Sequence, residues 1–198
     1  MIEVKISPSL DALATKLATE RERVLATMKG KIKRGYFSAP LKDYTGYVGE
    51  LIVFSYLRDQ GFKCYYKPKF DGADFGDIIV YLPDIEVEDG IGIAIEVKAA
   101  GKSYTGQPHL LVPEAQFKKR KYAAYVRVQL RDGHAIIDGY CTAKELVSPS
   151  TFGVYGTKTR DVGCAAARLR PLEGITNKIM KGRATIDLAN LEKQKRIL

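Results

Sequence analysis

The order of apolar segments along the chain predicts an α/β protein in which helices flank a mixed central β-sheet. Residues 44–60 keep apolar side chains at helical spacing, and three segments with the short apolar runs of strands follow before residue 100. A second, shorter helical segment over residues 113–121 precedes two further strand segments. Helices and strands in this order pack as layers around one sheet, and 198 residues suffice for one domain with a sizeable core.

The N-terminal part of the chain predicts a short strand and then a long helix. Residues 2–6 alternate apolar and polar side chains, as a strand with one buried face does. Ser7 and Pro8 form a helix start, because the hydroxyl can cap the first turn and proline fits the first helical position. Helical spacing then continues to the predicted stop at Gly30. We interpret the basic stretch that follows, up to Lys42, as a connector.

The middle of the chain predicts a β-rich block and a hairpin. The helix over residues 44–60 ends at Gly61, and strands are expected over residues 62–67, 77–82, 91–99, 122–130 and 134–141, the last two joined at Asp132-Gly133. Gly101 to Pro113 is predicted as a long flexible connection, and residues 142–147 as a single helical turn. Beyond Pro149 the pattern is glycine-rich and then basic, with a final helix from about Asp187.

The sequence further predicts one compact, cytoplasmic protein. We expect an N-terminal helical extension over residues 1–42, a core over residues 43–147 and a basic C-terminal extension over residues 148–198. The first residues lack the order of a secretory signal, and no apolar run is long enough to cross a bilayer, so no membrane association is expected. The three cysteines are widely spaced, which favours buried thiols in a reducing compartment over a disulfide framework or a metal site.

The charge of the protein is basic, and the excess is clustered. Lys and Arg number 32 against 23 Asp and Glu, which gives a net charge of +9. Clustered positive charge attracts phosphate backbones through counterion release, so we expect a nucleic-acid partner. The candidate contacts come from two basic runs that contain no acidic residue: Lys31, Lys33, Arg34, Lys118, Lys119 and Lys121. A solvated basic surface without a partner is the alternative.

Two charged side chains are predicted side by side on the strand over residues 91–99. Successive side chains of a strand point to opposite faces, so Glu96 and Lys98 share a face with the small residues Gly92 and Ala94. Charges on an otherwise apolar strand need a metal ion, each other or a bound phosphate as partner. This face of the strand is therefore a candidate site.

Two further acidic residues precede this strand. Asp77 opens the neighbouring strand, and because adjacent strands lie roughly 4.8 Å apart, Asp77 and Glu96 can share a hard divalent cation such as Mg²⁺. Glu50 lies on a helix that is apolar almost all round, which predicts a partly buried carboxylate. Taken alone, Asp77 is better explained as a turn residue that caps its own backbone, and for Glu50 the alternative is a pair with a Lys or Arg elsewhere.

Together these residues resemble the PD-(D/E)XK nuclease superfamily over about residues 46–141. The motifs that carry the resemblance are Gly49-Glu50, Gly76-Asp77-Ile78-Ile79-Val80 and Ile95-Glu96-Val97-Lys98. The central segment is similar to archaeal Holliday-junction resolvases, with Gly-Glu on the helix, Gly-Phe at its end and Glu-Val-Lys on the strand. The resemblance implies a restriction-endonuclease-like core of the order αβββαβ, here with N- and C-terminal extensions.

The resemblance also implies roles for these residues. The catalytic set would be Glu50, Asp77, Glu96 and Lys98, with Mg²⁺ as cofactor and Mn²⁺ as its substitute. Asp77, Glu96 and the backbone carbonyl of Val97 would hold the metal, and Glu50 would complete the site directly or through water. Lys98 would orient or deprotonate the attacking water. Gln116, on the helix after the Glu-x-Lys strand, is a possible accessory residue.

The expected activity is Mg²⁺-dependent endonucleolytic cleavage of duplex or branched DNA, by a homodimer as the family habit implies. A junction resolvase is an alternative within the superfamily, and an RNA-directed nuclease stays open. The alternative from another class is a DNA-binding protein without catalysis, against which the clustered acids argue because they repel phosphates. His109 and His134, the only histidines, are too far apart in the sequence to indicate a zinc site or a histidine-based triad.

Overall fold

The protein has a central β-sheet, and further helices and strands pack against its two faces. The structure, a computed structural model, describes residues 1–27, 39–66, 68, 77–81, 92–101, 109–119, 122–147 and 161–175, with only the backbone course for Ala39, Pro40, Lys42, Tyr81 and Gly92. Its elements are β1 (Ile2–Lys5), α1 (Pro8–Thr27), α2 (Ala39–Asp59), β2 (Cys64–Tyr66), β3 (Ile78–Tyr81), β4 (Gly92–Ala100), β5 (His109–Pro113), α3 (Glu114–Lys119), β6 (Ala124–Arg131), β7 (His134–Cys141), the 3₁₀ turn η2 (Ala143–Glu145), β8 (Asp161–Ala165) and the 3₁₀ turn η4 (Ala166–Arg168).

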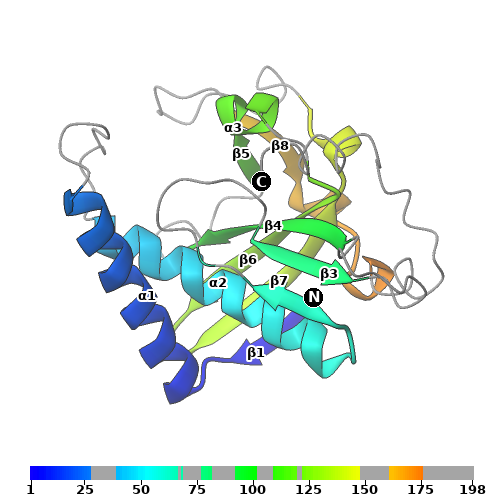
Figure 1. The fold of residues 1–198 in the computed structure, drawn as a ribbon. Coiled ribbons are helices and arrows are strands. Elements are labelled where there is room, and N and C mark those ends of the chain that lie inside the picture. Colours follow the sequence, from blue (N-terminus) through cyan, green and yellow to red (C-terminus); the bar gives the residue numbers. More distant parts are fainter. Residues whose placement is uncertain are drawn as a thin grey trace.

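The central sheet has six strands in the order β1-β7-β6-β4-β3-β2, and a separate two-stranded sheet pairs β5 with β8. Within the large sheet β4 and β6 are parallel, whereas the other neighbours are antiparallel. Parallel neighbours need a crossover connection, which here contains β5 and α3. Helices α1 and α2 lie across one face of the large sheet, while β5, β8 and α3 gather away from α1 (Figure 1). This arrangement confirms the predicted α/β fold with a mixed sheet flanked by helices.

Two apolar clusters correspond to the two faces of β4. Ile93, Ile95 and Val97 belong to the main core, which also contains the buried side chains of α1 and α2. Ala94 packs on the second cluster, which is built around β5, β8 and the ends of β6 and β7. Glu96, one position on from Ile95, is therefore on the face that α2 does not cover.

The predicted start of α1 is confirmed. The hydroxyl of Ser7 accepts a hydrogen bond from the backbone N–H of Leu10 at 3.2 Å, and Pro8 is the first helical residue. The predicted stop at Gly30 lies outside the described residues, as does the helix expected from Asp187.

The start of α2 differs from the prediction. The helix begins at Ala39, although residues up to Lys42 were expected to form a connector. Proline in a first helical turn loses no hydrogen bond, because the first N–H groups of a helix have no intrahelical acceptor, so Pro40 does not prevent the earlier start. The expected boundary between an extension and a core, after Lys42, thus falls inside this helix. The helix ends at Asp59, close to the predicted stop at Gly61, whose φ is 84°.

Helix α2 is packed closely against β4 through a glycine. A Cβ atom added to Gly49 would lie 2.5 Å from the Cβ atom of Ala99, which real Cβ contacts essentially never approach. The absence of a side chain at Gly49 therefore allows the helix to approach the strand. The neighbouring residue of the helix, Glu50, is half-buried.

Strands β5 and β8 are a correction to the sequence prediction, which expected a flexible connection over residues 101–113 and no strand near Gly163. The two strands pair with each other from His109 opposite Ala165 to Pro113 opposite Asp161. Their apolar residues are too few to show a period, and the two strands are about 50 residues apart in the chain, so pairing depends on tertiary structure.

The segment after β8 returns to the main sheet. Arg170 pairs with Tyr140 through backbone hydrogen bonds of 2.8 and 2.9 Å, and its guanidinium group lies over the Tyr140 ring. Arg170 Nη2 also donates to Glu145 Oε2 at 2.6 Å, and the backbone N–H and hydroxyl of Thr142 donate to the same oxygen at 2.7 and 2.8 Å. Burial opposes ionisation of Glu145, but the bonds from Thr142 and the charge of Arg170 outweigh it and lower the pKa of this carboxyl.

The N-terminal residues are also part of this fold. Strand β1 pairs with β7 along its length, and the buried side chains of Ala14 and Ala18 on α1 belong to the main core. No helix within the described ranges is long and apolar enough to cross a membrane.

Candidate active site

Asp77 connects the start of β3 to the middle of β4. Its backbone N–H donates to the carbonyl of Ile95 at 2.9 Å, and its carboxylate oxygen Oδ2 accepts the N–H of Val97 at 2.6 Å. The residue is 3% exposed. The N–H and C=O of one strand residue point to the same side of the strand, so the carbonyl of Val97 is directed to the edge at which the Asp77 carboxylate lies. Asp77 has a structural role as well, because its side chain satisfies a backbone donor beyond the last pair of the β3–β4 ladder.

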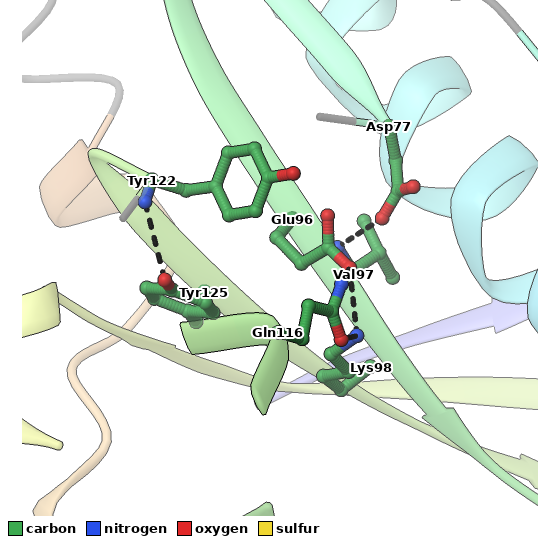
Figure 2. A network of polar contacts seen from close by, with 7 residues as sticks. All are labelled: Asp77, Glu96, Val97, Lys98, Gln116, Tyr122 and Tyr125. Atoms are coloured by element: carbon green, nitrogen blue, oxygen red, sulfur yellow. Dashed lines mark hydrogen bonds and ion pairs between the residues drawn. The ribbon is translucent and has the colours of Figure 1, made fainter. Parts of the chain in front are cut away.

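Glu96, Lys98 and Gln116 form a closed triangle of hydrogen bonds (Figure 2). Lys98 Nζ donates to Glu96 Oε1 at 2.7 Å and to Gln116 Oε1 at 2.9 Å, and Gln116 Nε2 donates to Glu96 Oε1 at 2.7 Å. Glu96 is 2% exposed, whereas the Lys98 side chain keeps 23% exposure. Strand β4 therefore presents a buried carboxylate together with an accessible ammonium group, and α3 covers both with the Gln116 amide.

The two buried carboxylates lie next to each other on neighbouring strands. Ile78 is the register partner of Ile95, so continuing the antiparallel register places Asp77 opposite Glu96 on the same face of the sheet. Figure 2 shows both side chains at the β3–β4 boundary, with Val97 between them. Asp77, Glu96 and the carbonyl of Val97 are thus oxygen donors gathered at one point of the sheet.

Glu50, on α2, is hydrogen-bonded to a tyrosine of the central sheet. Its Oε2 atom accepts a hydrogen bond from the hydroxyl of Tyr66, in β2, at 3.0 Å. Burial raises the pKa of Tyr66 above its usual value, and the negative charges of Glu50 and Asp77 raise it further. The Tyr66 hydroxyl therefore remains a protonated donor. Its pKa is affected by the carboxylates of Glu50, on α2, and of Asp77, which directly precedes β3. Among the described residues, no three Asp, Glu, His or Cys side chains are grouped closely enough to hold one metal ion by themselves.

Tyr66 is a site residue that sequence reasoning missed. A strand was predicted over residues 62–67, and it is observed over Cys64–Tyr66, but nothing in the local pattern distinguishes Tyr66 from Tyr65, which is 50% exposed. The register Tyr66 to Ile78 places Tyr66 on the face that α2 covers, and only this pairing directs its hydroxyl to Glu50.

An aromatic cluster supports the Gln116 side of the site. The rings of Tyr122 and Tyr125 meet edge to face with centroids 5.8 Å apart, and the Tyr125 hydroxyl accepts the backbone N–H of Tyr122 at 3.1 Å (Figure 2). Phe117 of α3 lies 6.3 Å from the Tyr125 ring. Tyr125 is also the register neighbour of Glu96 in β6. The cluster therefore holds α3 over the strand that carries Glu96 and Lys98.

A second buried polar group, also absent from the sequence predictions, follows on the same face of the sheet. Arg127 is the β6 register partner of Lys98. Its Nη1 atom donates to Asp138 Oδ2 at 2.6 Å, and Gln129 Nε2 donates to the same oxygen at 2.6 Å. The side chains of Arg127 and Asp138 are 5% and 8% exposed. The carboxylate of Asp138 balances the charge of Arg127 beside Lys98.

The candidate nucleic-acid contacts are only partly described. Lys118 and Lys119 are exposed on α3, and Lys118 Nζ forms an ion pair of 2.8 Å with Glu114 one helical turn earlier. Lys31, Lys33, Arg34 and Lys121 lie outside the described residues. The two described lysines are on the helix that carries Gln116, so they are positively charged groups beside the carboxylate site.

Comparisons with known proteins identify no close relative. No protein-family model matches the chain, and no curated protein matches it. The solved structure of D212, a nuclease from a fusselovirus, is similar with a TM-score of 0.43 and 12% sequence identity, over 76% of this chain and 96% of that chain. A likeness this distant assigns no role to any residue.

Proposed function

We propose that this protein is a Mg²⁺-dependent DNA endonuclease that hydrolyses phosphodiester bonds at a PD-(D/E)XK site. The observation that carries the proposal is the meeting of two buried carboxylates, Asp77 and Glu96, with the ammonium group of Lys98 at one point of the sheet. Buried acids in a sheet are costly unless a partner compensates their charge. A divalent cation together with a substrate phosphate would compensate both carboxylates in the bound state.

The donor set of the site suits a hard cation. Asp77, Glu96 and the carbonyl of Val97 supply oxygen atoms only, which are the ligands that Mg²⁺ prefers, and Mn²⁺ accepts the same ligands. Glu50 would complete the set directly or through water, in the orientation that Tyr66 gives it. When bound, the cation supplies positive charge to the phosphoryl oxygens and lowers the pKa of water.

The chain's own residues would orient the reactants and move the proton. Lys98 donates to Glu96 and Gln116, so its Nζ atom is held at the carboxylate edge. From there it would orient the attacking water and stabilise the negative charge that develops at the phosphate. Gln116 would position both side chains through its amide, which accepts a hydrogen bond from Lys98 and donates one to Glu96.

We propose DNA as the substrate because the chain carries a net charge of +9 and exposes Lys118 and Lys119 beside the site. A homodimer would place two such sites on the two strands of a duplex. A Holliday-junction resolvase of the same superfamily, an RNA-directed nuclease and a DNA-binding protein without catalysis are the alternatives that the experiment must separate.

The test is a cleavage assay on linear, supercoiled, single-stranded and four-way-junction DNA and on RNA, each with Mg²⁺, Mn²⁺ or EDTA. We expect cleavage that requires the metal and falls by at least about 10²-fold in Asp77→Asn, Glu96→Gln and Lys98→Met. Exchange of the exposed Lys119 for Met is the matched control, and it should weaken binding without abolishing cleavage.

The outcomes distinguish the candidates. Preferential cutting of the junction would favour the resolvase, and cutting of RNA alone would replace DNA as the substrate. Metal-independent cleavage, or full activity in Asp77→Asn, would overturn the proposed mechanism. Tight binding of DNA without cleavage under any metal would favour the non-catalytic protein.

A further inference from the structure

An exposed tyrosine lies on the face of the sheet that carries the candidate active site. In the registers of β2 with β3 and of β3 with β4, Tyr65 lies opposite Ile79, and Ile79 lies opposite Ala94. Ala94 is two positions before Glu96 in β4, and alternate residues of a strand share a face. Tyr65 therefore projects from the same face of the sheet as Asp77 and Glu96.

The Tyr65 side chain is accessible at the end of an apolar row. Tyr65 is 50% exposed, whereas Ile79 and Ala94, the next residues of this row, are half-buried. Single exposed apolar side chains are common on protein surfaces, so exposure alone indicates no site. What distinguishes Tyr65 is that its row lies directly beside the two buried carboxylates.

The register also fixes how far Tyr65 is from these carboxylates. Asp77 is two residues before Ile79, so it is a diagonal neighbour of Tyr65 across the pairing of β2 with β3. The Cα atoms of such neighbours are about 7–8 Å apart, a separation that an aromatic side chain can span. A phosphate held at Asp77 and Glu96 would thus bring the base of an adjoining nucleotide within reach of the Tyr65 ring.

Contacts on the other face of β2 fix the direction in which Tyr65 points. The Tyr66 hydroxyl donates to Glu50 at 3.0 Å, and the Tyr66 ring packs against Phe54 with centroids 5.7 Å apart. Because neighbouring residues of a strand point to opposite faces, these contacts direct Tyr65 away from α2. Tyrosine has only two side-chain torsions, so a ligand that covers its ring costs little side-chain entropy. Lys63, two residues before Tyr65, is exposed as well and supplies positive charge for a phosphate.

We propose that Tyr65 is a stacking platform for one unpaired base of the substrate, in a nucleotide next to the phosphodiester bond at the carboxylates. The platform rests on the proposed nuclease function and adds a preference among substrates. Every base has a π-face that an aromatic ring can cover, whereas a base stacked inside a duplex does not present this face. The site would therefore select positions at which a base is unpaired or turned out of the helix, such as a single-nucleotide bulge.

The test measures binding of the full-length protein to three otherwise identical DNA duplexes by fluorescence anisotropy, in EDTA so that no metal-dependent cleavage occurs. One duplex carries a single unpaired adenine, the second has an abasic unit at that position, and the third is fully paired. Loss of one stacked base weakens binding about 5–150-fold, so the adenine bulge should bind more tightly than the abasic bulge by this factor. The paired duplex should bind no more tightly than the abasic one.

Substitutions at Tyr65 assign this difference to its ring. Tyr65→Ala and Tyr65→Thr, the latter chosen because threonine favours strands, should bind the two bulged duplexes equally. Tyr65→Phe keeps the ring and should retain the difference. Leu13→Ala is the matched control, because Leu13 is 43% exposed on α1, which lies at the opposite face of the sheet (Figure 1), and it should also retain the difference.

Two results in EDTA would overturn the platform. The first is equal affinity of the unsubstituted protein for the adenine and abasic bulges. The second is a preference for the adenine bulge that Tyr65→Ala or Tyr65→Thr leaves unchanged, because the base would then stack elsewhere.

The same duplexes with Mg²⁺ or Mn²⁺ separate this inference from the proposed function. Cleavage within one nucleotide of the adenine bulge, reduced in Tyr65→Ala, would support both, and cleavage far from the bulge would overturn the position of the platform beside the reacting phosphate. Cleavage without any Tyr65-dependent preference in EDTA would overturn the platform alone. A Tyr65-dependent preference without cleavage in either metal would overturn the proposed function and leave the platform as a binding site.

Discussion

The contact between Gly49 and Ala99 allows a quantitative test of how α2 is placed on the sheet. In Gly49→Ala the new Cβ atom would begin 2.5 Å from the Cβ atom of Ala99. Carbon atoms pack at about 3.5–4.0 Å, so helix and strand must separate by roughly 1 Å. Overpacking of this kind costs about 1–3 kcal/mol. The opposing term is helix propensity, since alanine favours a helix over glycine by about 0.5–1 kcal/mol.

Gly46, one turn earlier on the same helix, separates these two terms. A Cβ atom at Gly46 would meet only Glu50 Oε1, at 4.0 Å, which is an ordinary contact. Gly46→Ala should therefore raise the free energy of unfolding by up to about 1 kcal/mol through helix propensity alone. Because both substitutions share that gain, the difference between them isolates the clash, and Gly49→Ala should be less stable than Gly46→Ala by about 1–3 kcal/mol.

The assay is urea unfolding followed by circular dichroism, with the slope of the transition checked for constancy. In Gly49→Ala/Ala99→Gly the two methyl groups no longer meet, so a double-mutant cycle should return a favourable coupling energy of about 1–3 kcal/mol. Equal stability of Gly49→Ala and Gly46→Ala, or a coupling energy near zero, would refute the close packing of α2 on β4 and with it the placement of Glu50.

Three further predictions concern the polar groups. Tyr66→Phe removes the donor that orients Glu50 and should raise the Mg²⁺ concentration needed for half-maximal cleavage about 10–100-fold. Tyr65→Phe, at the neighbouring exposed position, should leave that concentration unchanged. Equal metal titrations of the two variants would contradict the role of Tyr66. Asp138→Ala removes the carboxylate that accepts hydrogen bonds from both Arg127 and Gln129, so the free energy of unfolding measured in urea should fall by about 3–5 kcal/mol. A loss below about 1 kcal/mol would refute the contribution of this buried ion pair to stability. The lowered pKa of Glu145 contributes stability that is present above pH 4.5 and is lost as pH falls through the folded-state pKa. Urea midpoints of Glu145→Gln should therefore decline less than those of the unsubstituted protein across that acid range, and parallel curves would exclude the contribution.

Local sequence determined the elements whose signals lie within a few residues. Ser7 and Pro8 specify the start of α1 because a cap and a permitted proline act on adjacent peptide units. Alternation along β4 was enough to place Glu96 and Lys98 on one face, and the structure has them 2.7 Å apart at their charged atoms. Gln116 was a candidate from its position after that strand, and the structure places its amide on both charged groups.

Only the tertiary structure decided the contacts between segments that are distant in the sequence. The pairing of β5 with β8 and the bond from Tyr66 to Glu50 each depend on strand register. Register is set by which faces are buried in the whole protein, and a slip of one residue would turn every side chain to the opposite face. The sequence by itself therefore determined which strand carries the charged site, because that information is local. The structure decided how Asp77, Tyr66 and α3 surround it, because those positions follow from packing of the complete chain.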